Sequence, residues 1–287
     1  MSTFDLETYF VEQRTAVDAA LDDLLPAPRD PASDPGRLRE GMRYAVLLGG
    51  KRMRPLLTIA ACEAAGGEPR HAMPAGCALE MIHAYSLVHD DLPAMDNDLE
   101  RRGKPTVHVA FGHGNAILIG DALLTEAFRV LARGSEGVSR HNMAESVIVL
   151  SKHAGIDGMV GGQALDLAEG QSIRSLERLE EVHALKTGAL YAAAGALGGL
   201  AAHASPEVVA QLERYGLAFG IAFQHADDIL DDDQKDLREQ ALRRIDELTD
   251  ECRSIAAAFG ERAAALTAIA DWVQARARRA AAGDRRD

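Results

Sequence analysis

Residues 206–233, PEVVAQLERYGLAFGIAFQHADDILDDD, decide the fold class of this chain. The stretch predicts one long helix over 206–232, with a deeply apolar segment at 217–223 and a run of aspartates at its end. Further helical runs lie near 53–65, 72–91, 115–132, 142–154, 175–201 and 236–281. No alternating strand of six or more residues accompanies them, so the sequence predicts an all-α protein.

The remaining segments predict how the chain is organised. The first 25 residues read as one amphipathic helix, and the proline-rich segment 26–36 reads as a loop. A second helix is expected from Arg37 to the glycine pair Gly49–Gly50, and residues 280–287 are expected to be a charged, frayed tail. Because no repeat and no second linker occurs, we expect a single domain, residues 1–287, built as a bundle of roughly ten or more helices.

The composition narrows the class of protein and its partners. Hydrophobic residues make up 47% and charged residues 26% of the chain, which excludes disordered, collagen and coiled-coil proteins. A formal net charge of −13 argues against nucleic acid and anionic membranes as partners. The chain shows no C-x-x-C pair, no secretory signal and no apolar stretch long enough to span a bilayer, so we expect a reduced, cytoplasmic location.

Two aspartate-rich clusters each follow an apolar helical run. The first, DDLPAMDND, contributes Asp90, Asp91 and Asp96. The second, DDILDDD, contributes Asp227, Asp228 and Asp231. Acids at a helix C-terminus oppose the helix dipole, and like charges four residues apart repel each other, so a bound cation explains the clusters better than solvation. Carboxylate oxygens without nearby His or Cys favour Mg²⁺ over zinc, and the spacing excludes an EF-hand.

Basic residues stand where a phosphate group would need them. Lys51 and Arg54 in GGKRMR are three residues apart on one face of a helix, whose N-terminal amides also attract anions. Arg101 and Arg102 follow the first aspartate cluster and can bind phosphate bidentately. Lys186 interrupts an otherwise apolar run. Each of these residues alone is typical of a solvated surface, but together they indicate a diphosphate site.

The blocks that carry these residues resemble a known family. HAYSLVHDDLPAMDND (83–98), LLGGKRMRP (47–55), GGQALDL (161–167), KTGAL (186–190) and FQHADDILD (223–231) are similar to the signature blocks of the trans-isoprenyl diphosphate synthases. The bacterial farnesyl diphosphate synthase branch resembles the chain most. The resemblance covers about residues 36–235 and implies the isoprenoid synthase fold, with helices around a central cavity. It also implies a prenyltransferase that joins isopentenyl diphosphate head to tail to an allylic diphosphate, dimethylallyl or geranyl.

The resemblance assigns a role to each candidate site residue. Several Mg²⁺ ions would be held by Asp90, Asp91, Asp96, Asp227, Asp228 and Asp231. The allylic diphosphate would be held by Arg101 and Lys186, and isopentenyl diphosphate by Lys51, Arg54, His83 and Arg102. The allylic cation would be stabilised by oxygen dipoles of Thr187, Gln163 and Gln224. For His83 and Gln224 the alternative is a polar group satisfied within the core.

Product length is predicted from the helix that carries the first cluster. Tyr85 and Ser86, one turn before Asp90, would form the floor of the pocket that receives the growing chain. In the resembled branch an aromatic residue at the position of Tyr85 limits growth to fifteen carbons, so we expect farnesyl diphosphate, with geranylgeranyl diphosphate as the alternative. The family also implies a homodimer.

The sequence departs from the family after the second cluster. A loop of some two dozen residues, with lysines that close over the diphosphates, usually follows there, but here DDILDDD runs directly into QKDLREQALRRIDELTDECR. Such a loop serves to exclude water and complete the site. Three functions therefore stay open, namely the prenyltransferase, a class I terpene synthase and a low-activity modulatory subunit. GGKRMRP argues against the terpene synthase, and the intact aspartate motifs argue against the subunit.

Overall fold

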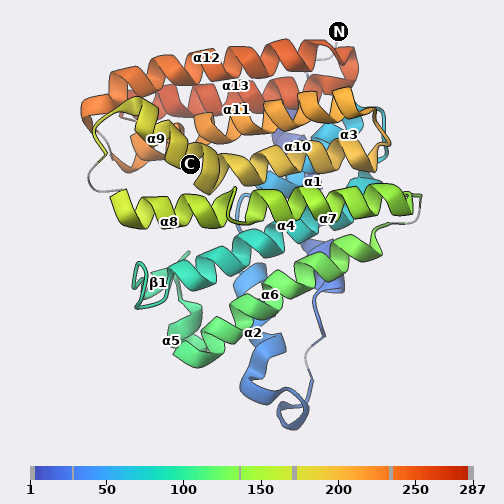
Figure 1. Cartoon of the computed structure of the whole chain (residues 1–287), viewed down its shortest axis with the longest axis vertical. Coiled ribbons are helices and arrows are strands. Elements are labelled where there is room, and N and C mark those ends of the chain that lie inside the picture. The colour runs from blue at the N-terminus through green and yellow to red at the C-terminus, as the bar shows by residue number, and fades with distance from the viewer. Residues whose placement is uncertain (1–3, 28, 136, 170–172, 233–234, 284–287) are drawn as a thin grey trace.

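Helices make up nearly all of the protein, which is seen here in a computed structural model (Figure 1). The structure describes residues 4–27, 29–135, 137–169, 173–232 and 235–283. The α-helices in this part are α1 (Leu6–Leu24), α2 (Leu38–Leu47), α3 (Met53–Ala64), α4 (Pro69–Asp90), α5 (Val107–Phe111), α6 (His113–Arg133), α7 (Arg140–Ala154), α8 (Met159–Glu169), α9 (Leu176–His183), α10 (Ala189–Ala201), α11 (Pro206–Asp231), α12 (Arg238–Ala257) and α13 (Ala264–Ala281). The all-α prediction is confirmed.

Short turns and one small hairpin connect the helices. The 3₁₀ turns are η1 (Pro31–Ser33), η2 (Pro35–Arg37), η5 (Lys235–Leu237) and η6 (Gly260–Ala263), and a π-helical turn, η4 (Ala184–Gly188), joins α9 to α10. Strands β1 (Glu100–Arg101) and β2 (Lys104–Pro105) pair antiparallel, with Glu100 opposite Pro105. This hairpin follows the first aspartate cluster and fixes where Arg101 and Arg102 lie.

Helix α10 forms the centre of the bundle. Its sequence, ALYAAAGALGGLA, is apolar on every side, and every residue except Leu200 is buried. A helix that is hydrophobic all round must be surrounded by other elements, and α10 packs against α3, α4, α7 and α11 (Figure 1). The buried core continues from α1 to α13, which supports the expectation of one domain; that expectation stays a prediction.

Two glycines allow α10 and α11 to approach each other closely. A Cβ atom on Gly195 would overlap the carbonyl oxygen of Leu212, and one on Gly216 would overlap the carbonyl oxygen of Tyr191. Because backbone occupies the space that a side chain would need, neither position has room for even a methyl group. This contact sets the position of α11, and therefore of the aspartates at its end.

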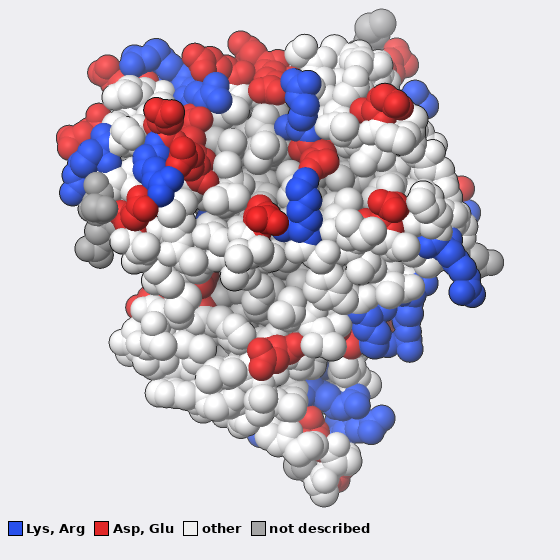
Figure 2. All heavy atoms as spheres, viewed as in Figure 1, with Lys and Arg blue, Asp and Glu red and all other residues white. Residues whose placement is uncertain are grey.

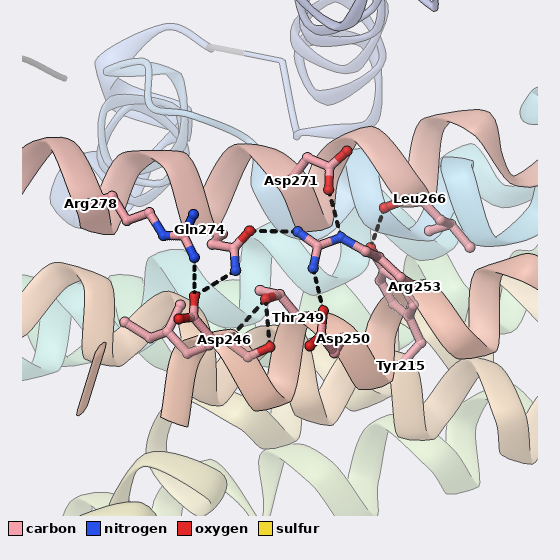
Figure 3. Close-up of polar contacts among 10 residues, drawn as sticks. Tyr215, Asp246, Thr249, Asp250, Arg253, Leu266, Asp271, Gln274 and Arg278 are labelled. Atoms are coloured by element: carbon pink, nitrogen blue, oxygen red, sulfur yellow. Dashed lines mark hydrogen bonds and ion pairs between the residues drawn. The ribbon is translucent and has the colours of Figure 1, made fainter. Parts of the chain in front are cut away.

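Helices α12 and α13 form an outer layer over α11 that a polar network holds together (Figure 3). Arg253 of α12 donates to Asp271 and Gln274 of α13, at 2.7 and 2.6 Å. Asp246 of α12 accepts hydrogen bonds from Gln274 and Arg278. These bonds occupy the outward face of α13 and thereby fix which side of that helix faces the interior.

The expected helical runs differ from the structure at several places. Helix α5 was not expected, and Lys51 precedes α3, which begins at Met53, so Lys51 and Arg54 do not share a helix face. The run near 236–281 is two helices, because η6 and the positive φ of 62° at Gly260 separate α12 from α13. Helix α8 was missed, since the Gly161–Gly162 pair lowers helix propensity. The expected tail 280–287 begins inside α13, which ends at Ala281, and residues 284–287 lie outside the described residues. No helix within the described residues combines the length and apolarity that crossing a membrane requires.

We predict that Gly195→Ala lowers the free energy of unfolding by about 1–3 kcal/mol, because the added methyl group forces α10 and α11 apart. Gly114→Ala in α6 is the matched control, since a Cβ there meets no atom within 4 Å. Because Gly114 lies in the first turn of α6, that control is expected to change the free energy of unfolding by about 0.5 kcal/mol or less. Urea denaturation followed by circular dichroism measures both; equal effects of the two substitutions would contradict the prediction.

Candidate active site

A cavity of about 910 Å³ lies among several helices of the bundle. It is bordered by the segment before α3, the C-terminal half of α4, helix α8, the π-helical turn η4 and the C-terminal part of α11. Of the residues singled out from the sequence, those that line it are Lys51, Arg54, His83, Tyr85, Ser86, Asp90, Arg102, Gln163, Lys186, Thr187, Gln224 and Asp227. Asp91, Asp96, Arg101, Asp228 and Asp231 are not among its lining residues.

One aspartate from each cluster lines this cavity. Asp90 is the last residue of α4, and Asp227 lies on the last turns of α11. Burial raises the pKa of Asp90 to about 6, although Lys186 nearby acts in the opposite direction. Burial also raises the pKa of Asp227, and the pairing of its carboxylate with Arg276 offsets this in part. The positive charge that the surrounding protein supplies is therefore too small to offset the cost of burying these two carboxylates.

The other members of the first cluster face elsewhere. Asp91 is buried, and its Oδ1 lies 2.6 Å from Nη2 of Arg101. Asp91, which was expected to bind metal, and Arg101, which was expected to bind diphosphate, thus bind each other. Asp96 is exposed, and its backbone N–H donates to the Asp90 carbonyl oxygen at 2.8 Å, which closes the turn after α4.

A chain of hydrogen bonds joins the second cluster to η4. The Thr187 hydroxyl donates to Oε1 of Gln224 at 2.8 Å, and Nε2 of Gln224 donates to Oδ1 of Asp228 at 2.9 Å. Nε2 of His183 lies 3.2 Å from the other oxygen of Asp228. Burial raises the pKa of Asp228, but the contacts with His183 and Gln224 outweigh burial and lower it below its usual value. The sequence interpretation assumed that no histidine lies near the aspartates, and this assumption was wrong.

The π-helical turn orients Lys186 toward the cavity. Single π-helical turns inside helices often mark functional positions because they redirect side chains. Nζ of Lys186 lies 2.6 Å from Oδ2 of Asp166 on α8, and both side chains are about one-third exposed. An ion pair at that exposure is weak, so the ammonium group can exchange Asp166 for a phosphate.

A second group of cations lies around the Gly49–Gly50 turn. Arg102, which has a positive φ of 53°, donates to the carbonyl oxygen of Gly49. The guanidinium of Arg54 stacks on the Tyr191 ring at 4.7 Å, and its Nε is buried without a hydrogen-bond partner among the described residues. Burial, together with the charges of Arg54 and Arg102, lowers the pKa of His83 well below its usual value. This end of the cavity therefore carries clustered positive charge and a neutral imidazole.

The wall of the cavity below Asp90 is formed by α4. Tyr85 is buried, and burial together with the charge of Asp90 raises its pKa to about 12. The Ser86 hydroxyl donates to the His83 carbonyl oxygen at 2.9 Å. On the opposite side, Oε1 of Gln163 on α8 is buried without a partner among the described residues. Because this oxygen accepts no hydrogen bond from the described residues, its dipole can interact with a positively charged ligand.

Sequence reasoning missed a residue of the last helix. Nη2 of Arg276 on α13 lies 2.6 Å from Oδ1 of Asp227, and the arginine side chain is only 4% exposed. Its guanidinium also lies over the rings of Phe223 and Trp272, at 5.3 and 5.8 Å. The one sequence signal is that Trp272 and Arg276 are four residues apart on an amphipathic helix, which is too common to identify a site.

The connection after the second cluster is short. Helix α11 ends at Asp231, an exposed residue, and the turn η5 begins at Lys235. Asp233, the last aspartate of the cluster, lies outside the described residues. Helix α12 then begins at Arg238, so the lysine-bearing loop expected from the resemblance has no counterpart in the chain.

The donor set of the cavity fits Mg²⁺. Asp90 and Asp227 offer hard carboxylate oxygens from two different helices, and Mg²⁺ is usually bound by one or two carboxylates together with substrate phosphate and water. The raised pKa of both groups indicates that a cation would relieve the cost of burying them. Asp91 and Asp228 could join only by exchanging their present contacts with Arg101 and His183.

Solved structures resemble this one closely. The apo structure of an FPP/GFPP synthase from Zymomonas mobilis has a TM-score of 0.85 and 38% sequence identity, covering 94% of this chain and 98% of that one. The geranyltransferase from Legionella pneumophila has a TM-score of 0.83 and 34% identity, covering 95% of this chain and 97% of that one. The prediction of the isoprenoid synthase fold is confirmed.

Sequence comparison gives relatives that are named as geranylgeranyl or geranylfarnesyl diphosphate synthases. The geranylgeranyl diphosphate synthase of Cyanophora paradoxa is 38% identical over 295 residues, 95% of this chain and 97% of that protein. The chloroplastic geranylfarnesyl diphosphate synthase of Leucosceptrum canum is 45% identical over 231 residues, 79% of this chain. The chain spans 62% of the length of that relative.

The polyprenyl synthetase family matches residues 35–243, which contain both aspartate clusters and every cavity-lining residue named above. On this match, and on the relatives just described, the chain belongs to the polyprenyl synthetase family.

Proposed function

We propose that this protein is a Mg²⁺-dependent prenyltransferase that joins isopentenyl diphosphate head to tail to an allylic diphosphate. The observation that carries the proposal is that one cavity combines an aspartate from each cluster with Lys186 on η4 and with the cations Lys51, Arg54 and Arg102. Two anion-binding ends in one cavity suit a reaction between two diphosphates. A site for a single diphosphate would have no use for the second group.

The allylic diphosphate would lie between the two aspartate clusters. Asp90 and Asp227 would hold Mg²⁺ there together with Asp96 and Asp231, and Asp91 and Asp228 would join once their present contacts exchange. The bound ions would neutralise charge on the leaving diphosphate. Lys186 would release Asp166 and bind the same diphosphate, and Arg101 would do so after releasing Asp91. Positive charge placed where the leaving group gains negative charge lowers the barrier to C–O bond cleavage.

The allylic cation formed by that cleavage would be stabilised by neutral oxygen atoms. Thr187, Gln224 and Gln163 line the cavity, and Oε1 of Gln163 accepts no hydrogen bond from the part of the chain that the structure describes. The Gln224 amide group is oriented by its bond to Asp228, so its oxygen is directed toward Thr187 rather than free to rotate. Pre-oriented dipoles need no rearrangement when the cation forms.

Isopentenyl diphosphate would bind at the end of the cavity near Gly49–Gly50. Lys51, Arg54 and Arg102 supply the positive charge, and neutral His83 supplies a hydrogen-bonding nitrogen. The alkene carbon would attack the allylic cation, and the proton lost afterwards would pass to the departing diphosphate.

The test is to incubate the purified full chain with Mg²⁺, isopentenyl diphosphate and dimethylallyl diphosphate, and to identify the products by mass spectrometry. We expect a prenyl diphosphate that forms only when both substrates and Mg²⁺ are present. Asp90→Asn is expected to lower kcat/KM by roughly 100-fold or more. Asp23→Asn, an exposed aspartate on α1, is the matched control and should leave the rate unchanged.

Other outcomes of this assay identify the alternative functions. A class I terpene synthase would consume a longer allylic diphosphate without isopentenyl diphosphate. A modulatory subunit would give no product from either mixture. The absence of the closing loop predicts that some allylic diphosphate is hydrolysed by water in parallel with condensation.

Two observations bear on product length. The relatives are named mainly as geranylgeranyl diphosphate synthases, and they support a twenty-carbon product at least as well as a fifteen-carbon one. Tyr85 favours farnesyl diphosphate, because its buried ring narrows the cavity below Asp90. We therefore propose geranylgeranyl diphosphate as the product that the relatives support, and farnesyl diphosphate as the second candidate.

Tyr85→Ala is expected to shift the product to a longer chain, because removing the ring deepens the pocket beneath the first cluster. Mass spectrometry of the extracted prenyl diphosphates measures the shift. Tyr85→Phe keeps the ring and removes only the hydroxyl group, so it should give the product of the unmodified protein. An unchanged chain length in Tyr85→Ala would show that Tyr85 does not form the floor.

We also propose that two copies of the chain assemble as a homodimer. The support is a surface over α5 and α6 with few charged side chains (Figure 2), on which Val109, Ile117 and Leu118 are exposed. One relative, from Arabidopsis thaliana, is named as the large subunit of a heterodimer. A cytoplasmic location stays a prediction.

Light scattering after size exclusion should give twice the chain mass of 30.7 kDa. Leu118→Glu is expected to shift the protein to the monomer, because it would bury a carboxylate in an apolar contact. Ile156→Glu, an exposed residue between α7 and α8, is the control. A monomer in the unmodified protein would contradict the proposal.

A further inference from the structure

Helices α9 and α11 bring two pairs of ionisable residues together behind the aspartates of the second cluster. Glu180 and His183 are three residues apart on α9, and His225 and Asp228 are three apart on α11, so each pair lies on one face of its helix. Each histidine contacts the carboxylate of the other helix. Nε2 of His183 lies 3.2 Å from Asp228, and Nε2 of His225 lies 3.3 Å from Glu180.

The cluster is enclosed and incompletely satisfied. The side chain of His225 has no exposed surface and that of His183 is 7% exposed, and their rings are 4.7 Å apart. Nδ1 of each imidazole is buried without a hydrogen-bond partner among the described residues. Leaving a buried polar atom unpaired costs about 1–3 kcal/mol, so a ligand bound by these nitrogens would recover part of that cost.

The arrangement of donors suits a metal ion. His183, His225 and Asp228 each offer one donor atom, and these atoms lie within 4.8 Å of one another. Donors around a tetrahedral ion with bonds of about 2.0–2.1 Å lie roughly 3.3 Å apart, so the side chains need to close by only a fraction of their present spacing. The Glu180 carboxylate, fixed by Arg244 at 2.9 Å, is placed to orient the His225 ring, as carboxylates often do for metal-binding histidines.

We propose that His183, His225 and Asp228 bind one divalent transition-metal ion, of the Zn²⁺ or Co²⁺ class, at a site behind the cavity that shares only Asp228 with the proposed Mg²⁺ ligands. Two imidazoles and a carboxylate are ligands that Zn²⁺ and Co²⁺ prefer, whereas Mg²⁺ prefers oxygen alone. Water would fill the remaining positions. His183 and His225 are not cavity-lining residues, so the ion would lie behind the wall of the cavity.

Because this site shares Asp228 with the second aspartate cluster, a bound ion would affect activity. This step rests on the proposed function. An ion bound to His183 and His225 would hold the Asp228 carboxylate away from the cavity and from the Mg²⁺ that the second cluster would bind. Zn²⁺ or Co²⁺ at low concentration is therefore expected to inhibit the Mg²⁺-dependent reaction. His225→Gln should relieve the inhibition, because it removes one ligand and leaves Asp228 in place.

Binding can be measured without substrates. The metal-free full chain is titrated with Co²⁺ in excess Mg²⁺, which occupies the oxygen-only sites, and the visible absorption of Co²⁺ bound by nitrogen ligands is recorded. We expect one equivalent to bind, and His225→Gln and His183→Gln to weaken binding by roughly 100-fold or more, since even changes to residues that orient the ligands cost 10–100-fold. Zn²⁺ should displace the bound Co²⁺ and raise the melting temperature.

His153→Gln is the matched control. His153 is also buried and lies 2.9 Å from a glutamate, Glu213, but it is not part of the cluster, so this variant should bind Co²⁺ as the unmodified protein does. Glu180→Gln retains all three ligands and should weaken binding less than loss of a histidine, which keeps the test valid if a histidine variant fails to fold. Equal Co²⁺ binding by His225→Gln and the unmodified protein, or no absorption in either, would overturn the proposal. Because no substrate is present, either result is independent of the prenyltransferase assay.

Discussion

The cost of burying carboxylates next to one another organises the functional part of this protein. Two acidic clusters meet at one cavity, yet each contributes a single aspartate to its lining, Asp90 from α4 and Asp227 from α11. The adjacent aspartates turn away and find partners, Asp91 with Arg101 and Asp228 with His183 and Gln224. Burying several unpaired charges together would cost more than folding can supply, so pairing within the protein keeps the structure stable while no cation is bound.

Ion pairs of this kind also hold the cations that we propose bind the diphosphate. Lys186 and Arg101 are both partly exposed and both paired with an aspartate. The Lys186–Asp166 pair is partly exposed on both sides and contributes little free energy, so in the proposed reaction a diphosphate would replace Asp166 as the partner of Lys186. Asp91 is buried, so its release from Arg101 would require a metal ion to compensate for the lost pair. Asp227 is held differently, because Arg276 is almost fully buried between it and two aromatic rings. The second cluster is thus anchored to the last helix, whose orientation depends on the network that joins α12 and α13.

In the proposed reaction, chain length and water exclusion would depend on parts of the cavity other than the aspartates. Tyr85 and Ser86 line the cavity one helical turn before Asp90, so under the proposal product length would change without altering the chemistry at the aspartates. The short connection between α11 and α12 provides no counterpart of the closing loop that the family resemblance implies.

The sequence alone determined the fold class, the two acidic clusters and the cationic residues around Lys51, because helical periodicity and clustered charge are local properties that a linear pattern records. The fold decided which of those charges meet. Nothing in the spacing of DDLPAMDND distinguishes Asp90 from Asp91, whereas the end of α4 directs one into the cavity and the other toward Arg101. Arg276 and His183 are distant in sequence from the aspartates they contact and carry no motif of their own. Their roles follow from the close packing of α9, α11 and α13, because only three-dimensional packing brings groups from separate helices within hydrogen-bonding distance.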